Sequence, residues 1–284
     1  MKSRRAKLII CIIAVVLILF IVGDIIASKH FLSLSEYSLE SDKLNSTIRI
    51  IQLTDLHNSA FGQNNQRLVS QVYDQNPDLI LITGDLLNSS EDDTKIVTDL
   101  IKNLSLIAGV YVSMGNHELE FMERTGVDIK EMYVESGAYV LDESYTDISI
   151  KGQKLRIGGV YGYCLPERYH LVDERKKSQC ELLKGFQNTD RYKIIMSHLP
   201  YAWWNYGFGN DWDVDLVLCG HTHGGQVIIP FLGGLYDGET GWFPGYISGY
   251  KHNGCDIIVS RGLGNTESLP RLNNIPEIVV IDID

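Results

Sequence analysis

The chain has 284 residues, of which 44% are hydrophobic and 21% are charged, so it can bury a sizeable core and is ordinary in composition for a globular protein. Its formal net charge is -11, although basic residues crowd its first seven positions, so the remainder is more acidic still. Such a body repels phosphate backbones, which excludes a general nucleic-acid binder but not a small phosphate ester held by a local cation.

The N-terminal segment has the character of a membrane span. Residues 8–22 are an unbroken apolar run, and the positions up to Ala27 extend it with a single charge. About 20 such residues in a helix cover ~30 Å, the thickness of a bilayer core. The preceding Lys and Arg residues favour a cytoplasmic N-terminus and an extracytoplasmic body. A cleaved signal peptide is the alternative, but the run is long for one and no Ala-x-Ala site follows it.

We therefore predict a cytoplasmic basic tail and an uncleaved transmembrane signal anchor over residues 1–30, which places the protein in the cell membrane as a single-pass chain. Residues 31–47 are polar, and we interpret them as a juxtamembrane linker with room for a short strand near 37–39. Linker-like composition does not recur after residue 48, so we expect one catalytic domain over 48–284.

The first part of that domain alternates between apolar runs and helical periodicity. Strands are predicted over 48–53, 78–83 and 110–113, with helices over 65–75 and 93–104. This alternation indicates a parallel α/β arrangement. Each strand ends in polar residues, and the carboxyl ends of strands are where open α/β sheets hold their ligands.

The second part has shorter strands and more turns. Antiparallel strands are predicted over 139–141, 145–150 and 155–160, followed by a helix over 173–185 and by strands over 192–196, 215–219, 227–229, 256–260 and 277–281. We expect an α/β (α+β) protein in which two sheets pack face to face with helices outside.

Polar side chains gather where the predicted strands end. They are Asp55, His57, Asp85, Asn116, His117, His198, His221 and His223. Each has an ordinary explanation as a turn or cap residue, but five of the chain's 8 histidines falling in such positions together is not expected by chance.

Carboxylate, imidazole and amide groups suit Mn, Fe or Zn better than soft metals. Two ions ~3.5–4 Å apart need a bridging carboxylate and can hold a hydroxide that attacks phosphorus in line. A histidine beside the metals could protonate the leaving oxygen. The constellation therefore predicts a two-metal phosphohydrolase.

The order Asp55-x-His57, Gly84-Asp85, Gly115-Asn116-His117-Glu118, His198 and Gly220-His221-x-His223 resembles the calcineurin-like metallophosphoesterase superfamily over roughly residues 48–283. Segments 230–233 and 260–264 look like its bacterial membrane-associated phosphodiesterase branch, which includes hydrolases of UDP-diacylglucosamine pyrophosphate. The resemblance implies a four-layer αββα sandwich of two mixed β-sheets flanked by helices.

The resemblance also implies two divalent metal ions. Asp55, His57 and His223 would hold the first, Asn116, His198 and His221 the second, and Asp85 would bridge them. Mn, Fe, Zn and Co all remain open, because these ligands accept each of them.

His117 would be the general acid or leaving-group stabiliser, oriented by a carboxylate such as Asp85. Glu118 stands where many relatives carry Asp and is not expected to be a ligand. Every position needed for the metals is present, which disfavours a non-catalytic membrane scaffold.

We predict a membrane-anchored dimetal phosphohydrolase that cleaves a phosphodiester or pyrophosphate bond by attack of a metal-bridging hydroxide. A phosphomonoesterase with the same metals is the alternative. Segments 201–206, 231–236 and 241–246 are rich in aromatic residues and lie close to the motifs in sequence. Such side chains suit a membrane interface, so a lipid-linked phosphate ester is one substrate hypothesis; ordinary loop packing is the other interpretation. The sequence leaves the oligomeric state open.

Overall fold

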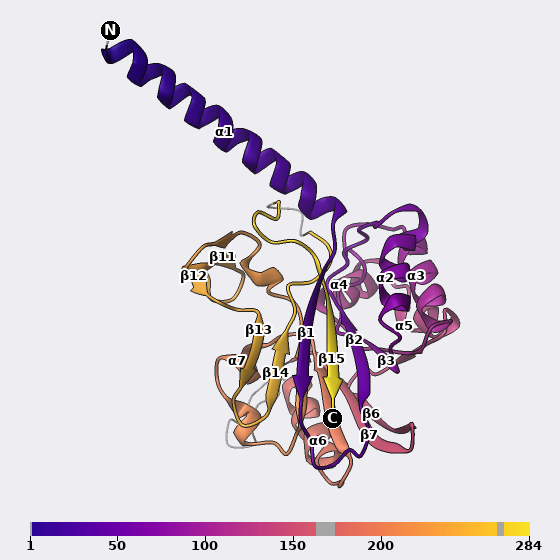
Figure 1. Cartoon of the computed structure of the whole chain (residues 1–284). Helices are drawn as coiled ribbons and strands as arrows, with labels where there is room; N and C mark the ends of the chain where they lie inside the picture. Colours follow the sequence, from indigo (N-terminus) through magenta and orange to yellow (C-terminus); the bar gives the residue numbers. More distant parts are fainter. Residues whose placement is uncertain (1, 163–173, 266–269) are drawn as a thin grey trace.

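The computed structural model describes residues 2–162, 174–265 and 270–284, and in it a long N-terminal helix projects from a body of packed sheets and helices (Figure 1). The α-helices are α1 (Lys2–His30), α2 (Gln66–Asp74), α3 (Lys95–Ser105), α4 (Asn116–Thr125), α5 (Ile129–Glu135), α6 (Glu174–Phe186) and α7 (Tyr201–Trp204). The short 3-10 helices are η1 (Gln63–Asn65), η2 (Phe208–Asn210) and η3 (His223–Gly225).

The strands fall into two large sheets and one small sheet. They are β1 (Ser33–Leu39), β2 (Ile48–Leu53), β3 (Leu79–Ile82), β4 (Gly109–Val112), β5 (Ala138–Val140), β6 (Ser144–Ile150), β7 (Gln153–Val160), β8 (Tyr192–Ser197), β9 (Leu216–Cys219), β10 (Ile228–Ile229), β11 (Gly233–Asp237), β12 (Gly241–Gly245), β13 (Gly249–His252), β14 (Asp256–Val259) and β15 (Glu277–Ile283).

The first sheet has the strand order β1-β15-β2-β3-β4-β5. Strands β2 to β5 are parallel, because α2, α3 and the α4–α5 pair form the crossovers between them. The second sheet has the order β13-β14-β9-β8-β7-β6, with β7, β8, β9 and β14 parallel and both edge strands antiparallel. Both sheets are therefore mixed, and the parallel strands align their carboxyl ends.

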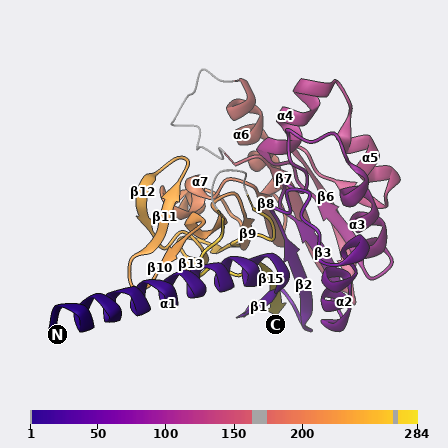
Figure 2. The same cartoon turned by 90° about the horizontal axis from the view of Figure 1, so that it is seen from above.

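Three hydrophobic cores separate four layers (Figure 2). Side chains of β3 alternate between two of them: Ile80 and Ile82 pack with the helices α2 to α5, whereas Leu81 packs between the two sheets. A third core joins the second sheet to α6 and α7 through residues such as Phe186 and Trp203. Each fully buried side chain of this size contributes ~1.5–3 kcal/mol. The predicted αββα sandwich is confirmed.

Two parts of the fold differ from the sequence-based prediction. The predicted linker contains β1, which pairs in parallel with β15 and so belongs to the first sheet. An edge strand with one buried face needs few large apolar residues, and its pattern therefore resembled a linker. Strand β5 joins β4 in parallel instead of forming an antiparallel meander, because α4 and α5, which were not predicted, carry the chain back across the sheet.

Helix α1 is long and apolar enough to be a candidate membrane span. A window within Arg4–His30 has a mean hydropathy of 3.3, and 0% of it is buried against the body. Its last turns differ, because Ser28 is buried where the helix meets the body. The apolar part of the helix therefore lies free of the fold, while its C-terminal end is attached to it.

Candidate metal centre

The carboxyl ends of the two large sheets meet, and all eight predicted site residues lie there. Asp55 and His57 follow β2, Asp85 follows β3, Asn116 and His117 begin α4 after β4, His198 follows β8, and His221 and His223 follow β9. Three groups of side chains have ligand atoms within 4.8 Å of one another: Asp55, His57 and His223; His57, Asp85 and His117; Asp85, His198 and His221. Shared members make these groups one continuous cluster.

The first group is buried and pairs two imidazoles. The Nε2 atoms of His57 and His223 are 3.1 Å apart, and Asp55 Oδ1 lies 3.7 Å from His223 Nε2. The backbone N–H of His221 donates to both carboxylate oxygens of Asp55, at 3.1 and 3.0 Å, which ties the β9 exit to the β2 exit. Burial raises the pKa of Asp55 to about 6.

The third group, Asp85, His198 and His221, is joined by Asn116, whose amide oxygen lies beside His198. His198 Nδ1 lies 2.7 Å from the carbonyl oxygen of Thr83, which can only accept, so Nδ1 carries a proton. His198 Nε2 then faces Asp85 Oδ2 at 3.1 Å and Asn116 Oδ1 at 3.2 Å. Two oxygens and a ring nitrogen at this separation can be held together by a metal ion or by a proton on Nε2. The donor set therefore fits a metal ion, with a proton as its substitute.

The electrostatics of the cluster agree with that fit. Burial lowers the pKa of His57 to about 3 and of His221 to about 4, and it holds the pKa of His223 well below its usual value. These imidazoles are neutral near pH 7, which is the form that binds metals. Burial alone would lower the pKa of His198, but the Asp85 carboxylate raises it to about 9. Burial would likewise raise the pKa of Asp85, and His198 holds it below its usual value.

The cluster also concentrates backbone strain. Five of its members have positive φ: Asp55 (52°), His57 (46°), Asp85 (54°), His221 (70°) and His223 (48°). Left-handed φ values are uncommon for residues other than glycine, and they persist where the surrounding structure enforces them. Such strain at five positions of one cluster is typical of a functional site.

The glycines of the motifs allow close approach of the chain to the carboxylates. A Cβ atom at Gly220 would lie 2.2 Å from Thr54 Oγ1 and 2.5 Å from Asp55 Oδ2. A Cβ at Gly115 would lie 2.1 Å from Asp85 Oδ1. Side chains at these two positions would displace the carboxylates from the cluster.

Glu118 is a residue whose importance the sequence did not reveal. It is fully buried, and its carboxylate accepts from the backbone N–H groups of Asp85 (2.8 Å), Leu86 (2.8 Å) and Gly115 (2.9 Å) and from the Tyr133 hydroxyl (3.0 Å). Burial raises the pKa of Glu118. Glu118 thereby joins the exits of β3 and β4. The Ser/Thr-x-x-Glu signature that would have marked it is absent from the sequence, because Gly115 occupies the N-cap of α4.

His117 is oriented by a different group from the one expected. Asp85 Oδ1 accepts from the backbone N–H of His117 at 2.9 Å, whereas the ring Nδ1 accepts from the backbone N–H of Ser89 at 3.0 Å. With Nδ1 used as an acceptor, the proton of the neutral ring resides on Nε2. The ring of His117 lies 4.5 Å from that of His57, edge to face.

Arg271 is a second residue that no motif marks. It is fully buried, and its Nη2 lies 3.1 Å from His223 Nδ1 and donates to the carbonyl of Arg261 at 2.7 Å. Its Nε donates to the carbonyl of Gly264 at 2.7 Å. Burial lowers the pKa of Arg271 to about 10, so it stays charged at neutral pH. Arg271 therefore fixes the ring of His223 through Nδ1, while Nε2 faces His57.

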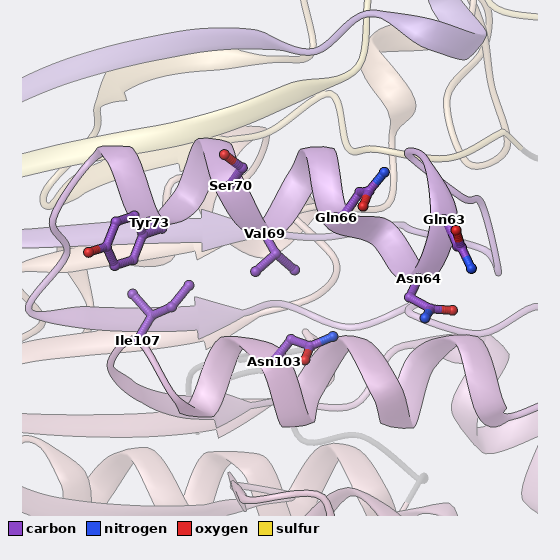
Figure 3. Close-up of a pocket in the computed structure, with 8 residues that line it drawn as sticks. All are labelled: Gln63, Asn64, Gln66, Val69, Ser70, Tyr73, Asn103 and Ile107. Atoms are coloured by element: carbon purple, nitrogen blue, oxygen red, sulfur yellow. The ribbon is translucent and has the colours of Figure 1, made fainter.

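Two cavities of similar volume lie in different parts of the body. One of about 440 Å³ is lined by residues that include Leu199, Tyr201 and Glu239, and the Tyr201 ring lies 6.0 Å from that of His221. Another of about 420 Å³ lies between α2 and α3, where side chains such as Val69 and Asn103 face one another (Figure 3). Only the first adjoins the cluster through its lining residues.

With this geometry established, similarity to known proteins identifies the family. The model of the calcineurin-like phosphoesterase family matches residues 48–225, which contain every residue of the cluster. The chain belongs to the calcineurin-like phosphoesterase family. The predicted relationship is thus confirmed, and the chain carries a phosphoesterase domain.

Three bacterial proteins are among those similar to this calcineurin-like chain. The uncharacterized metallophosphoesterase Cj0846 of Campylobacter jejuni is 28% identical over 86% of this chain, which spans 61% of that protein's length. An uncharacterized metallophosphoesterase of Aquifex aeolicus is 26% identical over 89% of this chain and 92% of its own length. Phosphodiesterase YaeI of Escherichia coli is 27% identical over 83% of this chain and 82% of its own length.

Proposed function

We propose that this chain is a dimetal phosphoesterase that hydrolyses a phosphodiester or pyrophosphate bond. The observation that carries the proposal is the continuous buried cluster in which acceptor atoms face one another and Asp85 belongs to two of the three groups. The relative from Escherichia coli is named a phosphodiesterase, which supports the diester preference.

The proposed ligands follow the two ends of the cluster. Asp55, His57 and His223 hold one divalent cation, Asn116, His198 and His221 hold the other, and Asp85 lies between them. When bound, the two cations supply Lewis-acid activation of water and neutralise charge on the phosphoryl oxygens. To act as a ligand, His198 would have to release the Nε2 proton that it otherwise shares with Asp85.

His117 is the proposed proton donor to the leaving oxygen. Its Nδ1 is engaged by the backbone N–H of Ser89, so the ring presents a proton on Nε2. It also lies within 4.8 Å of ligand atoms of His57 and Asp85. A hydrogen bond from Nε2 would stabilise the negative charge that develops on a poor alkoxide leaving group. Complete transfer of a proton needs the imidazolium form, in which Nδ1 carries the second proton and no longer accepts from Ser89.

We further propose that residues 1–30 form a basic tail and a membrane anchor, with the body outside the cytoplasm. Support comes from the exposed apolar surface of α1 and from Arg4, Arg5 and Lys7 before it. The catalytic unit then comprises residues 48–284 together with β1, which segment 31–47 contributes to the first sheet. An anchored site suits a phosphate ester carried by a lipid.

A substrate panel tests the catalytic proposal. The full chain in detergent micelles, loaded with Mn, Fe, Zn or Co, should hydrolyse bis-p-nitrophenyl phosphate faster than p-nitrophenyl phosphate. Chelation should abolish the activity, and the same metal should restore it in step with the bound metal measured by elemental analysis. A preference for the monoester would identify a phosphomonoesterase instead. Absence of turnover with two ions bound would refute the proposal that this cluster catalyses phosphoester hydrolysis.

A further inference from the structure

A face of large apolar side chains lies exposed on the small sheet β10-β11-β12, which we call the aromatic hairpin. Its exposed residues are Phe231, Leu232, Tyr236, Trp242, Phe243 and Tyr246. Phe231 is 95% exposed and Trp242 is 66% exposed. In both views α1 extends toward the side of the body on which this sheet lies (Figures 1 and 2). The hairpin and the free part of α1 therefore share one side of the molecule.

Three rings of the hairpin pack against one another. Tyr236 and Trp242 are 5.1 Å apart edge to face, and Trp242 and Phe243 are 6.5 Å apart. Contiguous apolar surface of this kind is uncommon on a soluble face and marks an interaction site. Burial of several such side chains together gives a substantial binding free energy.

One short segment connects the hairpin directly to α1. The Asp24 carboxylate of α1 accepts from the backbone N–H of Asn273, and Ser28 Oγ donates to the carbonyl of Arg271 at 3.3 Å. On its other side, Asn273 Nδ2 donates to the carbonyl of Ile228 in β10 at 2.9 Å. Ile228 N in turn donates to the carbonyl of Leu272 at 3.0 Å. The direction of the helix is thereby set relative to the hairpin.

We propose that the aromatic hairpin is a second membrane contact, whose rings enter the headgroup region of the bilayer that α1 spans. The inference rests on the anchoring proposed above and adds a defined orientation of the body. Aromatic rings with polar tips favour that region. Residues 231–246 contain no Lys or Arg, and Asp237 and Glu239 are their charged residues. Ring burial drives the contact, so anionic lipids are not required.

This contact brings the phosphoesterase site to the lipid surface. The hairpin starts just after η3, which carries His223. Its Asp237 accepts from the Tyr201 hydroxyl at 2.7 Å, and the Tyr201 ring adjoins His221. A substrate embedded in the same leaflet could therefore reach the cluster while its acyl chains remain in the bilayer.

Tryptophan quenching by bromolipids tests the proposal on the full chain. The protein is reconstituted in phosphatidylcholine vesicles with or without bromine on the upper acyl chain, and the emission of Trp242→Phe is subtracted from that of the unaltered chain. The other three tryptophans, Trp203, Trp204 and Trp212, are present in both chains, so the subtraction removes their emission. We expect the Trp242 emission to fall at least about twofold with bromolipid, because its ring lies in the interface.

The matched control moves the indole to the opposite side. Tyr73 on α2 is 65% exposed, so Tyr73→Trp in the Trp242→Phe background carries an equally exposed indole, which should remain unquenched by bromolipid. Equal quenching at both positions would overturn the proposal, as would emission from Trp242 that is quenched by acrylamide alone. Protection of Trp242 from both quenchers would indicate self-association through the hairpin and would also overturn it.

Flotation of the chain with the vesicles distinguishes failure of the membrane anchor from failure of the hairpin contact. A chain that does not float with the vesicles has neither membrane contact, whereas a chain that floats without quenching of Trp242 has only the anchor. Turnover of bis-p-nitrophenyl phosphate reports on the metal site in both cases. Loss of the hairpin contact and loss of the proposed function are therefore distinguishable.

Discussion

The metal cluster and the aromatic hairpin are neighbours in the chain but opposite in character. The segment that carries His221 and His223 is polar and mostly buried, whereas the hairpin that starts a few residues later is apolar and largely exposed. Both depart from the usual rule that polar groups face water and large apolar groups do not. Each departure motivates one of the two proposals: bound cations for the buried polar groups and a lipid surface for the exposed rings.

The largest expected effect tests the cluster itself. Asp85→Asn removes the carboxylate shared by two of the three groups, and turnover should fall by roughly 10³-fold or more, since a cation supplies several kcal/mol of charge stabilisation. The measurement is kcat together with bound metal by elemental analysis. Asp42→Asn, an exposed change elsewhere, should leave both unchanged. Full activity in Asp85→Asn with two ions bound would exclude Asp85 as a ligand shared by the two cations.

Substitution of the proposed acid should cause a smaller, substrate-dependent loss. His117→Gln should lower kcat by about 10²–10⁴-fold on an alkyl phosphodiester, the usual range for a proton-transfer group. The loss should be much smaller with p-nitrophenolate, which departs without a proton. His252→Gln, an exposed histidine paired with Asp256, serves as the control. Equal losses on both substrates would contradict the acid role.

Glu118 should matter for stability more than for chemistry. Glu118→Ala leaves the buried N–H groups of Asp85, Leu86 and Gly115 without their acceptor, so the free energy of unfolding should fall by at least ~3 kcal/mol. Urea denaturation measures the change. Glu120→Ala, which removes one exposed contact to Ser89, should cost no more than about 0.5 kcal/mol. Similar losses in both variants would show that Glu118 does not organise the strand exits.

The smallest effects are expected for substitutions in the aromatic hairpin. Trp242→Ser with Phe243→Ser should change the free energy of unfolding by less than about 0.5 kcal/mol and leave bis-p-nitrophenyl phosphate turnover unchanged. Turnover of a phosphodiester lipid in vesicles should fall by roughly tenfold, because partial ring burial is lost. Leu106→Ser, an exposed apolar change far along the chain, is the control. Equal losses on soluble and vesicle substrates would place the hairpin within the chemistry.

The sequence alone determined much of the site, because its signals are local. Apolar runs mark strands. A polar residue directly after such a run lies at the carboxyl end of its strand, whichever strands pair with it. The placement of Asp55, Asp85 and His198 at strand ends follows from that pattern, whereas the meeting of those ends from two different sheets depends on tertiary packing. The apolar run at the N-terminus is equally local, since an unbroken stretch needs no tertiary context to be recognised.

Only the tertiary structure decided which distant segments support these elements. Strand β1 pairs with β15 from the other end of the chain, and Glu118 reaches Asp85 over a separation of 33 residues. Arg271 reaches His223 over 48 residues, and Asn273 links α1 to β10. None of these residues carries a local pattern, because a contact between remote positions depends on how the layers pack. For the same physical reason, the side on which the aromatic hairpin faces α1 could be seen only in the folded chain.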